Sequence, residues 1–193
     1  MKEQGTAARI ADVARRILVE QGAEAVSMRR VGEAVGVTAM AIYRHYPNRE
    51  ALLRAVATAS GRELASEWAR LPRSGTLVER IDVLLDGFLD FALGRPHLYT
   101  FLMSDAWAQA RRFPEDFHDG QGPPFTVVVE FVEEGMRTGM LRRDDPLEVA
   151  LAVTSCAQGL VQQYLSGRVA MDEAGFRALC HRTMRRIIDG LRA

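Results

Sequence analysis

The chain has 193 residues, of which 48% are hydrophobic and 26% charged, and its formal net charge is zero. These values are typical of a globular protein, and they exclude disordered and fibrous classes. The charge is unevenly divided, because residues 1–50 hold eight Lys and Arg against six Asp and Glu, whereas the remainder holds 17 against 19. Nucleic-acid coating by phosphate neutralisation alone is therefore not expected.

Membrane and redox features are weak in this sequence. No apolar run approaches the roughly 18 residues of a membrane helix, and the start, MKEQGTAARIADVARR, lacks the apolar segment of a signal peptide. We therefore expect a cytoplasmic protein with no membrane partner. Cys156 and Cys180 are too few for a disulfide framework or a zinc site, and we interpret them as small buried hydrophobic residues.

The first predicted helix runs from Thr6 to about Gln21, and Gly22 ends it. Its apolar residues recur at the spacing that forms one face of a helix. They are Ile10, Val13, Ala14, Ile17 and Leu18. We expect this face to pack on the two helices that follow, which would give a small three-helix core.

The next segment, VSMRRVGEAVGVTAMAIYRHYPNREALL over residues 26–53, reads as two short helices joined by a tight turn. Ser27 is suited to cap the first helix, because its hydroxyl can accept a hydrogen bond from an amide of the opening turn. Gly36 stands where the chain must reverse. Thr38 can cap a second helix that reaches about Tyr43. This pattern predicts a helix-turn-helix, whose second helix fits the major groove of B-DNA.

A long fourth helix is predicted from about Asn48, with Pro47 ending the preceding one. Its apolar positions continue to Leu71, and a break is possible near Ser60–Gly61. The stretch Pro72–Gly75 then interrupts the chain. This helix is the covalent connection between a small N-terminal domain and everything that follows.

The rest of the chain is also predicted to be helical. Thr76 and Glu79 form a capping box, and Asp145 can cap a later helix. The predicted helices are 76–94, 96–110, 125–138, 146–167 and 172–191, with a Gly- and Pro-rich loop over 111–124. No strand-like alternation competes with the helical periods, so we expect an all-α protein of about nine helices.

Residues 1–53 resemble the N-terminal DNA-binding domain of the TetR family, the tetracycline-repressor-like bacterial transcription regulators. The matching residues are Gly22, Ser27, Arg29, Val31, Ala34, Gly36-Val37-Thr38, Ile42-Tyr43, His45-Tyr46 and Asn48-Arg49-Glu50-Ala51-Leu52. The resemblance implies a helix-turn-helix DNA-binding domain over 1–50, joined through the fourth helix to a helical-bundle ligand-binding and dimerisation domain over 51–193.

Phosphate contacts in that family come from the caps of helices two and four and from both ends of helix three. The resemblance carries these roles to Ser27, Thr38, Tyr43, His45 and Arg49. Hydroxyl, imidazole and guanidinium groups can all bond phosphate oxygens. The family commonly has lysine at the position of Arg49, and both side chains are cations. Tyr43 has a second interpretation as a half-buried aromatic residue.

Base reading is expected from Arg29, Ala39, Met40, Ala41 and Arg44. Arg29 could bond a guanine edge through two donors, and the apolar side chains could touch thymine methyl groups. Two alternatives stay open at this point. Met40 could be a packing residue, and Arg44 could be a solvated one.

A small, largely apolar effector is implied by the resemblance and supported by composition. Aromatic and methionine residues are more numerous in the later helices than a minimal bundle needs, and a few polar groups could orient a ligand. The candidate residues are Phe88, Phe91, His97, Tyr99, Met103, Trp107, Phe125, Phe131, Gln158, Gln162 and Tyr164. Such stripes are more often core. An effector would act by favouring an arrangement in which helix four displaces the reading heads from the DNA.

The last two helices carry broad apolar stripes and could pair with those of a two-fold mate as a four-helix interface. Such a homodimer would place two heads on successive major grooves of a palindromic operator. The alternative is that the stripes are intramolecular core. Arg182, Arg185 and Arg186 are interpreted as a solvated face.

An enzyme is the first competing class, and we expect no catalytic residues, no cofactor and no metal. The histidines are scattered, and neither a nucleophile elbow nor a phosphate-binding glycine loop occurs. Asp116, His118 and Asp119 lie close together, but we interpret them as solvated loop residues. The second alternative is a dimeric small-molecule-binding protein without specific DNA binding. The sequence therefore predicts a homodimeric, effector-responsive transcriptional regulator that acts as a repressor.

Overall fold

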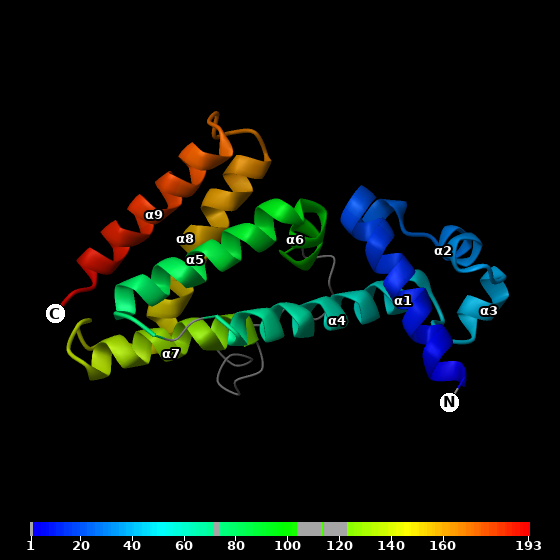
Figure 1. Ribbon diagram of the computed structural model, residues 1–193, viewed down its shortest axis with the longest axis horizontal. Helices are drawn as coiled ribbons and strands as arrows, with labels where there is room; N and C mark the ends of the chain where they lie inside the picture. The colour runs from blue at the N-terminus through cyan, green and yellow to red at the C-terminus, as the bar shows by residue number, and fades with distance from the viewer. Residues whose placement is uncertain (1, 72–73, 104–112, 114–122) are drawn as a thin grey trace. The chain divides into compact units, whose positions relative to one another are not determined.

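The protein is described by a computed structural model over residues 2–71, 74–103, 113 and 123–193, with side chains from residue 5 and, in the last range, from residue 125. The described residues form nine α-helices and one short 3-10 helix, with an isolated bridge between Leu141 and Arg192 as their one β-type pairing (Figure 1). The predicted all-α class is confirmed. The elements are α1 (Lys2–Gln21), η1 (Ala23–Ala25), α2 (Met28–Val35), α3 (Ala39–Tyr43), α4 (Arg49–Ala69), α5 (Leu77–Gly94), α6 (Pro96–Met103), α7 (Pro123–Arg137), α8 (Pro146–Leu165) and α9 (Glu173–Gly190).

The helices fall into two compact units. The first unit holds residues 1–63 and α6, and the second holds the end of α4 together with α5, α7, α8 and α9. The assignment of separate functions to 1–50 and 51–193 stays a prediction. The predicted break near Ser60–Gly61 is wrong, because α4 continues through it. A glycine inside a helix costs only about 1 kcal/mol, and burial of Leu64 and Trp68 just beyond it offsets that cost.

The predicted helix caps are present in the first unit. The Ser27 hydroxyl accepts from the Arg30 amide at 3.2 Å, and the Thr38 hydroxyl accepts from the Ala41 amide at 3.2 Å. The Asn48 side chain accepts from the Ala51 amide at 2.7 Å and so starts α4. Gly36 takes a left-handed conformation with φ of 80°, which a residue with a side chain adopts only at a cost. Local sequence therefore fixes where α2, α3 and α4 begin.

The core of the first unit is the apolar face predicted for α1. Its residues contact α2, which packs in turn on α3, and most of them are buried. The fully buried members are Ile10, Ala14, Leu18, Val31 and Ile42. The Tyr46 hydroxyl, beyond the end of α3, donates to the Ala7 carbonyl oxygen at 3.1 Å. The head is therefore a three-helix core with α3 held by both apolar contacts and a hydrogen bond.

Helix α6 packs on the first unit, which the sequence did not indicate. It contacts α1 and η1, and its side chains Leu98, Tyr99 and Phe101 are buried. Burial raises the pKa of Tyr99 to about 12. The His97 ring lies beside Gly22, where a Cβ on that glycine would stand 3.6 Å from Nδ1. An element far along the chain is thus part of the N-terminal head.

Arg49 fastens the start of α4 to the segment that precedes α2. Its Nε donates to the Val26 carbonyl oxygen at 2.8 Å, and its Nη2 donates to the Ala23 carbonyl oxygen at 2.6 Å. The Val26 carbonyl lies directly before the Ser27 cap, and the Ala23 carbonyl lies in η1, where its oxygen also accepts from the Val26 amide. A planar guanidinium can reach two such acceptors at once, which a single ammonium does less well.

The second unit is built on the antiparallel hairpin of α8 and α9, against which α5 and α7 pack (Figure 1). Asp145 caps α8 as predicted, because its carboxylate accepts from the amides of Leu147 and Glu148. The Thr76–Glu79 capping box is also formed. A core cluster joins α7 to α8 through Val132, Val149 and Ala150.

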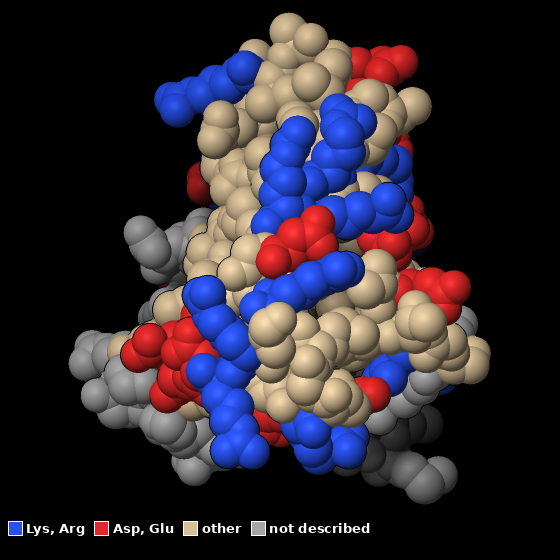
Figure 2. Space-filling view, turned by 90° about the vertical axis from the view of Figure 1, so that its left-hand side faces the viewer, with Lys and Arg blue, Asp and Glu red and all other residues tan. Residues whose placement is uncertain are grey.

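A ladder of charged side chains joins α5 to α9 along one side of this unit. Residues four apart on α5 meet residues four apart on α9, in antiparallel order. The carboxylates of Asp82, Asp86 and Asp90 meet Arg185, His181 and Arg177 respectively, and His181 also reaches Asp82. Figure 2 shows one face of the molecule on which Lys and Arg side chains form a band interrupted by Asp and Glu.

His181 holds the centre of the ladder as an imidazolium. Its Nδ1 lies 3.0 Å from an Asp82 oxygen and its Nε2 lies 2.8 Å from an Asp86 oxygen. Carboxylates only accept, so both ring nitrogens must carry protons. Burial by itself would lower the pKa of His181, but the hydrogen bonds and charges of Asp82 and Asp86 outweigh it and raise the pKa above 6.5. Arg177 and Arg185 flank the group on α9.

His181 should therefore make the stability of the second unit depend on pH. A raised folded-state pKa gives stability that is complete below the unfolded value of 6.5 and is lost as pH rises through the folded value. We expect His181→Gln to lower the free energy of unfolding by on the order of 1 kcal/mol at pH 5.5 and by less at pH 9. Thermal unfolding across this range measures it. Arg177→Gln is the control, because Arg177 pairs with Asp90 and Glu173, which do not contact His181, so its loss should not vary with pH in that range.

Arg49→Ala should destabilise the head, because two backbone carbonyls lose a charged donor. Hydrogen bonds to charged groups contribute about 1.5–3 kcal/mol each, so a loss of roughly 2 kcal/mol is expected at this half-buried site. Hydrogen exchange of the amides in α1–α3 of the full chain reports it. Arg54→Ala removes an exposed arginine from the same helix and should leave exchange unchanged. Equal exchange in the two variants would contradict the assigned role.

Candidate nucleic-acid interface

Helix α3 presents one face to solvent and the other to the core. Ile42 is fully buried, whereas Met40 is 69% exposed and Tyr43 is 47% exposed. Arg44, directly after the helix, is also exposed. Ala39 and Ala41 are half-buried and so are less accessible than the sequence suggested. The packing alternative for Met40 is therefore disfavoured in this unit, since a large apolar side chain there covers no core.

Gly32 permits the close approach of α2 and α3, and the sequence analysis did not identify it. A Cβ at this position would stand 2.9 Å from the Val37 carbonyl oxygen and 3.4 Å from the Ile42 side chain. The first distance is shorter than van der Waals contact, so backbone would have to move. In the sequence, Gly32 stands next to Val31 and one helical turn before Gly36. That position alone does not show that a glycine is needed, because the need comes from the neighbouring helix α3.

The two capping hydroxyls keep a donor for an anion. Ser27 and Thr38 use an oxygen lone pair to accept the cap hydrogen bond, and both residues are exposed. A hydroxyl can donate while it accepts, so each proton is available to a phosphate oxygen. His45 is half-buried at the end of α3. The two predicted phosphate-contacting hydroxyls are thus exposed, whereas Arg49 is bonded to carbonyls through two of its nitrogens.

The two arginines of α2 differ in their availability. Arg30 donates to the Ala25 carbonyl oxygen at 3.4 Å and to the Gln21 amide oxygen at 2.6 Å. The Arg29 side chain is 86% exposed, and its Nε donates to the Glu33 carboxylate at 2.9 Å. Arg29 is thus the arginine of this helix that extends into solvent, and its contact with DNA stays a prediction.

The predicted effector residues are divided between the two units. His97, Tyr99 and Met103 belong to the first unit, and Trp107 lies outside the described residues. The aromatic residues of the second unit have partners or are buried: Phe88 meets Trp68 edge-on, Phe91 is buried, Phe125 packs on the α7–α8 cluster, Phe131 lies under the Arg80 guanidinium, and Tyr164 stacks on Phe176. Gln158 and Gln162 are exposed on α8.

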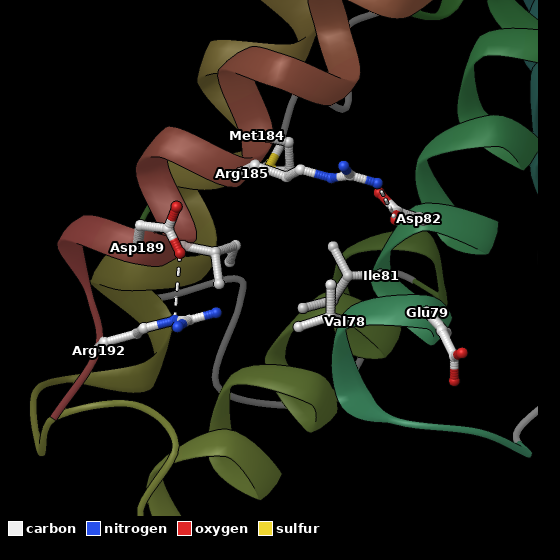
Figure 3. Close-up of a pocket in the computed structure, with 9 residues that line it drawn as sticks. Val78, Glu79, Ile81, Asp82, Met184, Arg185, Asp189 and Arg192 are labelled. Carbon is white, nitrogen blue, oxygen red and sulfur yellow. Dashed lines mark hydrogen bonds and ion pairs between the residues drawn. The ribbon is translucent and has the colours of Figure 1, made fainter.

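A groove of about 410 Å³ lies in the second unit between the first turns of α5 and the last turns of α9 (Figure 3). Its apolar lining includes Val78, Ile81 and Met184, while the Asp82–Arg185 and Asp189–Arg192 ion pairs stand at its edge. None of the predicted effector residues lines it. Its two arginines, Arg185 and Arg192, are paired with carboxylates, so the groove offers a ligand no free positive charge.

Other kinds of site were sought in the part of the chain that the structure describes. Within it, no group of three or more His, Cys, Asp or Glu is placed to hold a metal ion. The loop residues Asp116, His118 and Asp119 lie outside it. No helix in the described part is long and apolar enough to span a membrane.

Comparison with known proteins assigns both parts of the chain. Residues 10–56 match the family described as bacterial regulatory proteins, tetR family, and residues 82–187 match the tetracyclin repressor-like C-terminal domain. The chain is 26% identical over 166 residues to the HTH-type transcriptional repressor AcnR of Corynebacterium diphtheriae, covering 82% of this chain and 80% of that protein.

Solved structures share the fold over nearly the whole chain. A protein of unknown function from Rhodococcus sp. RHA1 superposes with a TM-score of 0.79 at 18% identity, covering 97% of this chain and 96% of that one. The regulator FadR of Bacillus subtilis, solved in complex with stearoyl-CoA, gives a TM-score of 0.73 at 14% identity, covering 95% and 98%. Together with the matches of both domains, these similarities place the chain in the TetR family of transcription regulators, which are not enzymes.

Proposed function

We propose that the protein is a transcriptional repressor that binds a palindromic operator as a homodimer and is released by a small, largely apolar effector. The observation that carries this proposal is the two-sided packing of α3, with Ile42 buried and Met40, Tyr43 and Arg44 facing solvent. An exposed set of base-reading and phosphate-bonding side chains on a rigidly packed helix is what direct readout in the major groove requires. The similarity to a named repressor supports the sign of regulation.

Different residues on and near α3 would contact the phosphates and the bases of the DNA. Tyr43, Ser27 and Thr38 carry hydroxyls that can donate to phosphate oxygens and so position the head. Arg29 carries the donors that suit a guanine edge, and Met40 offers apolar contact to a thymine methyl group. Arg49 would act chiefly by holding the start of α2, since two of its nitrogens bond carbonyls there.

Dimerisation through α8 and α9 is supported by the surface of α8. Its exposed positions include Ala152, Ser155 and Gly159, which are small residues spaced along one side of the helix. Small residues allow another helix to approach closely. A two-fold dimer carries two heads, and successive major grooves of a palindromic operator lie about 34–36 Å apart.

An effector would act through the segments that pass between the units. Helix α4 has residues in both units, and α6 follows α5 in sequence but packs on α1 and η1. A ligand that prefers one arrangement of these helices would shift the population of heads able to bind DNA, by no more than its difference in affinity for the two arrangements. FadR of Bacillus subtilis, which shares this fold, was solved in complex with stearoyl-CoA, which supports an apolar effector here.

Substitutions at Tyr43 and Arg29 should have different effects on DNA binding. Tyr43→Phe removes one phosphate donor and should weaken binding about 5-fold on all sequences, since a neutral hydrogen bond contributes about 1 kcal/mol. Arg29→Ala should lower discrimination at one base pair per half-site by roughly 1–3 kcal/mol. Duplexes selected from a random pool, and their single-base variants, measured by fluorescence anisotropy over a range of salt, test both.

Two results would refute this division of roles or the function itself. Losses of equal size on every sequence from both substitutions would refute the division. If the native protein selected no preferred duplex and showed no steep salt dependence, the alternative of a ligand-binding dimer without specific DNA binding would be favoured.

Gly159→Lys should dissociate the dimer while leaving the subunit folded. A Cβ at Gly159 meets no atom within 4 Å in the single chain, and lysine favours the helix over glycine. At a two-fold interface it would add bulk and bring like charges together. Light scattering after size exclusion measures the mass, and circular dichroism confirms folding. Gly61→Lys, at an equally open helical glycine of α4, is the matched control. A dimeric Gly159→Lys protein would place the interface elsewhere.

A further inference from the structure

Arg29 and Glu33 form an ion pair on the outer face of α2. Arg29 Nε lies 2.9 Å from Glu33 Oε1, and the two side chains are 86% and 64% exposed. They stand one helical turn apart, on the side of the helix away from the buried residues Met28, Val31 and Gly32. The pair is therefore directed outward from the head, on the helix that precedes α3.

This pair contributes little to the stability of the helix. Arg29 lies in the first turn of an eight-residue helix and Glu33 near its end, so both charges oppose the helix dipole. The order, with the cation N-terminal to the anion, is also the weaker orientation for residues four apart. Exposed pairs of this kind typically contribute less than about 1 kcal/mol. Helix stability therefore gives no reason for Glu33 at this position.

The geometry of the pair leaves a defined edge of Arg29 open. Glu33 accepts from Nε, and neither Nη1 nor Nη2 of Arg29 has an acceptor among the described residues. These two amino groups form the outer edge of the guanidinium, which can donate to O6 and N7 of one guanine. A carboxylate on Nε restricts rotation about the last bonds of the side chain, so the open edge is held ready for a base.

We propose that Glu33 is a specificity-determining residue that acts by positioning Arg29 for a guanine. This inference rests on the proposed function, in which Arg29 reads a base. Glu33 also places a negative charge on the DNA-facing side of a head whose first 50 residues carry only two excess positive charges. That charge repels phosphates on every sequence, so it weakens non-specific binding while the oriented arginine keeps its contact with the correct base.

Glu33→Gln tests the proposal because selectivity and affinity should change in opposite directions. The glutamine keeps the size of the side chain but loses the charge that holds Arg29. We expect non-specific affinity at low salt to rise about 2- to 5-fold, and the preference for guanine at one base pair per half-site to fall at least about 3-fold. A merely structural role would lower affinity on all sequences together. Thermal unfolding confirms that the variant is folded.

Two controls separate the effect of charge from the effect on Arg29. Glu20→Gln changes an exposed glutamate of α1 that makes no ion pair with any described residue, so it alters the charge of the head equally and should keep the guanine preference. In the Arg29→Ala background, Glu33→Gln should no longer change base preference, because the two residues act as one unit.

The outcomes distinguish this inference from the proposed function. Selective binding by the native protein, lost at one position in Glu33→Gln and unaffected in Glu20→Gln, supports the inference. Selective binding that Glu33→Gln retains in full overturns it and leaves the proposed function standing. A native protein that selects no duplex overturns both.

Discussion

The burial of Ile42 against α2 is the contact on which the rest of the head depends. A five-residue helix has too few internal hydrogen bonds to persist alone, so α3 exists because its core face is held. Gly32 lets α2 come close enough for that contact, and the Thr38 cap and the Tyr46 hydrogen bond fix the two ends. Because the inner face of α3 is fixed in this way, the side chains of Met40 and Tyr43 on its other face are exposed to solvent.

Features that are local in sequence were predictable, and features that depend on a distant partner were not. Capping residues act within one turn, so Ser27, Thr38, Asn48, Asp145 and the Thr76–Glu79 box could be identified from spacing alone. Arg49 illustrates what the sequence could not predict. Its position after the Asn48 cap shows that a cation stands at the start of α4, but not that this cation donates to the Ala23 and Val26 carbonyls. The break expected at Gly61 failed for the same reason, since packing beyond the glycine decided the outcome.

Aromatic residues of the later helices illustrate why a binding site could not be derived from composition. Each large ring must be covered, and the second unit covers them internally: Tyr164 stacks on Phe176 with centroids 4.1 Å apart, and the Arg80 guanidinium lies 4.7 Å from the centroid of Phe131. Arg80 is itself paired with Glu134 through two hydrogen bonds. The aromatic residues of these helices thus form packing contacts among α5, α7, α8 and α9. A count of residue types cannot distinguish such packing residues from residues that line a cavity.

The position of α6 gives the head a structural dependence on the chain beyond it. A helix that begins directly after α5 supplies the buried Leu98 and Tyr99 to a unit otherwise made from residues 1–63. Moving α6 away from α1 would expose these side chains, at roughly 1.5–3 kcal/mol for each large apolar group. Within the described residues, the chain passes between the two units inside α4 and again between α5 and α6. Under the proposed function, loss of the α6 contacts would change the head in a discrete step, because packed contacts are either made or broken.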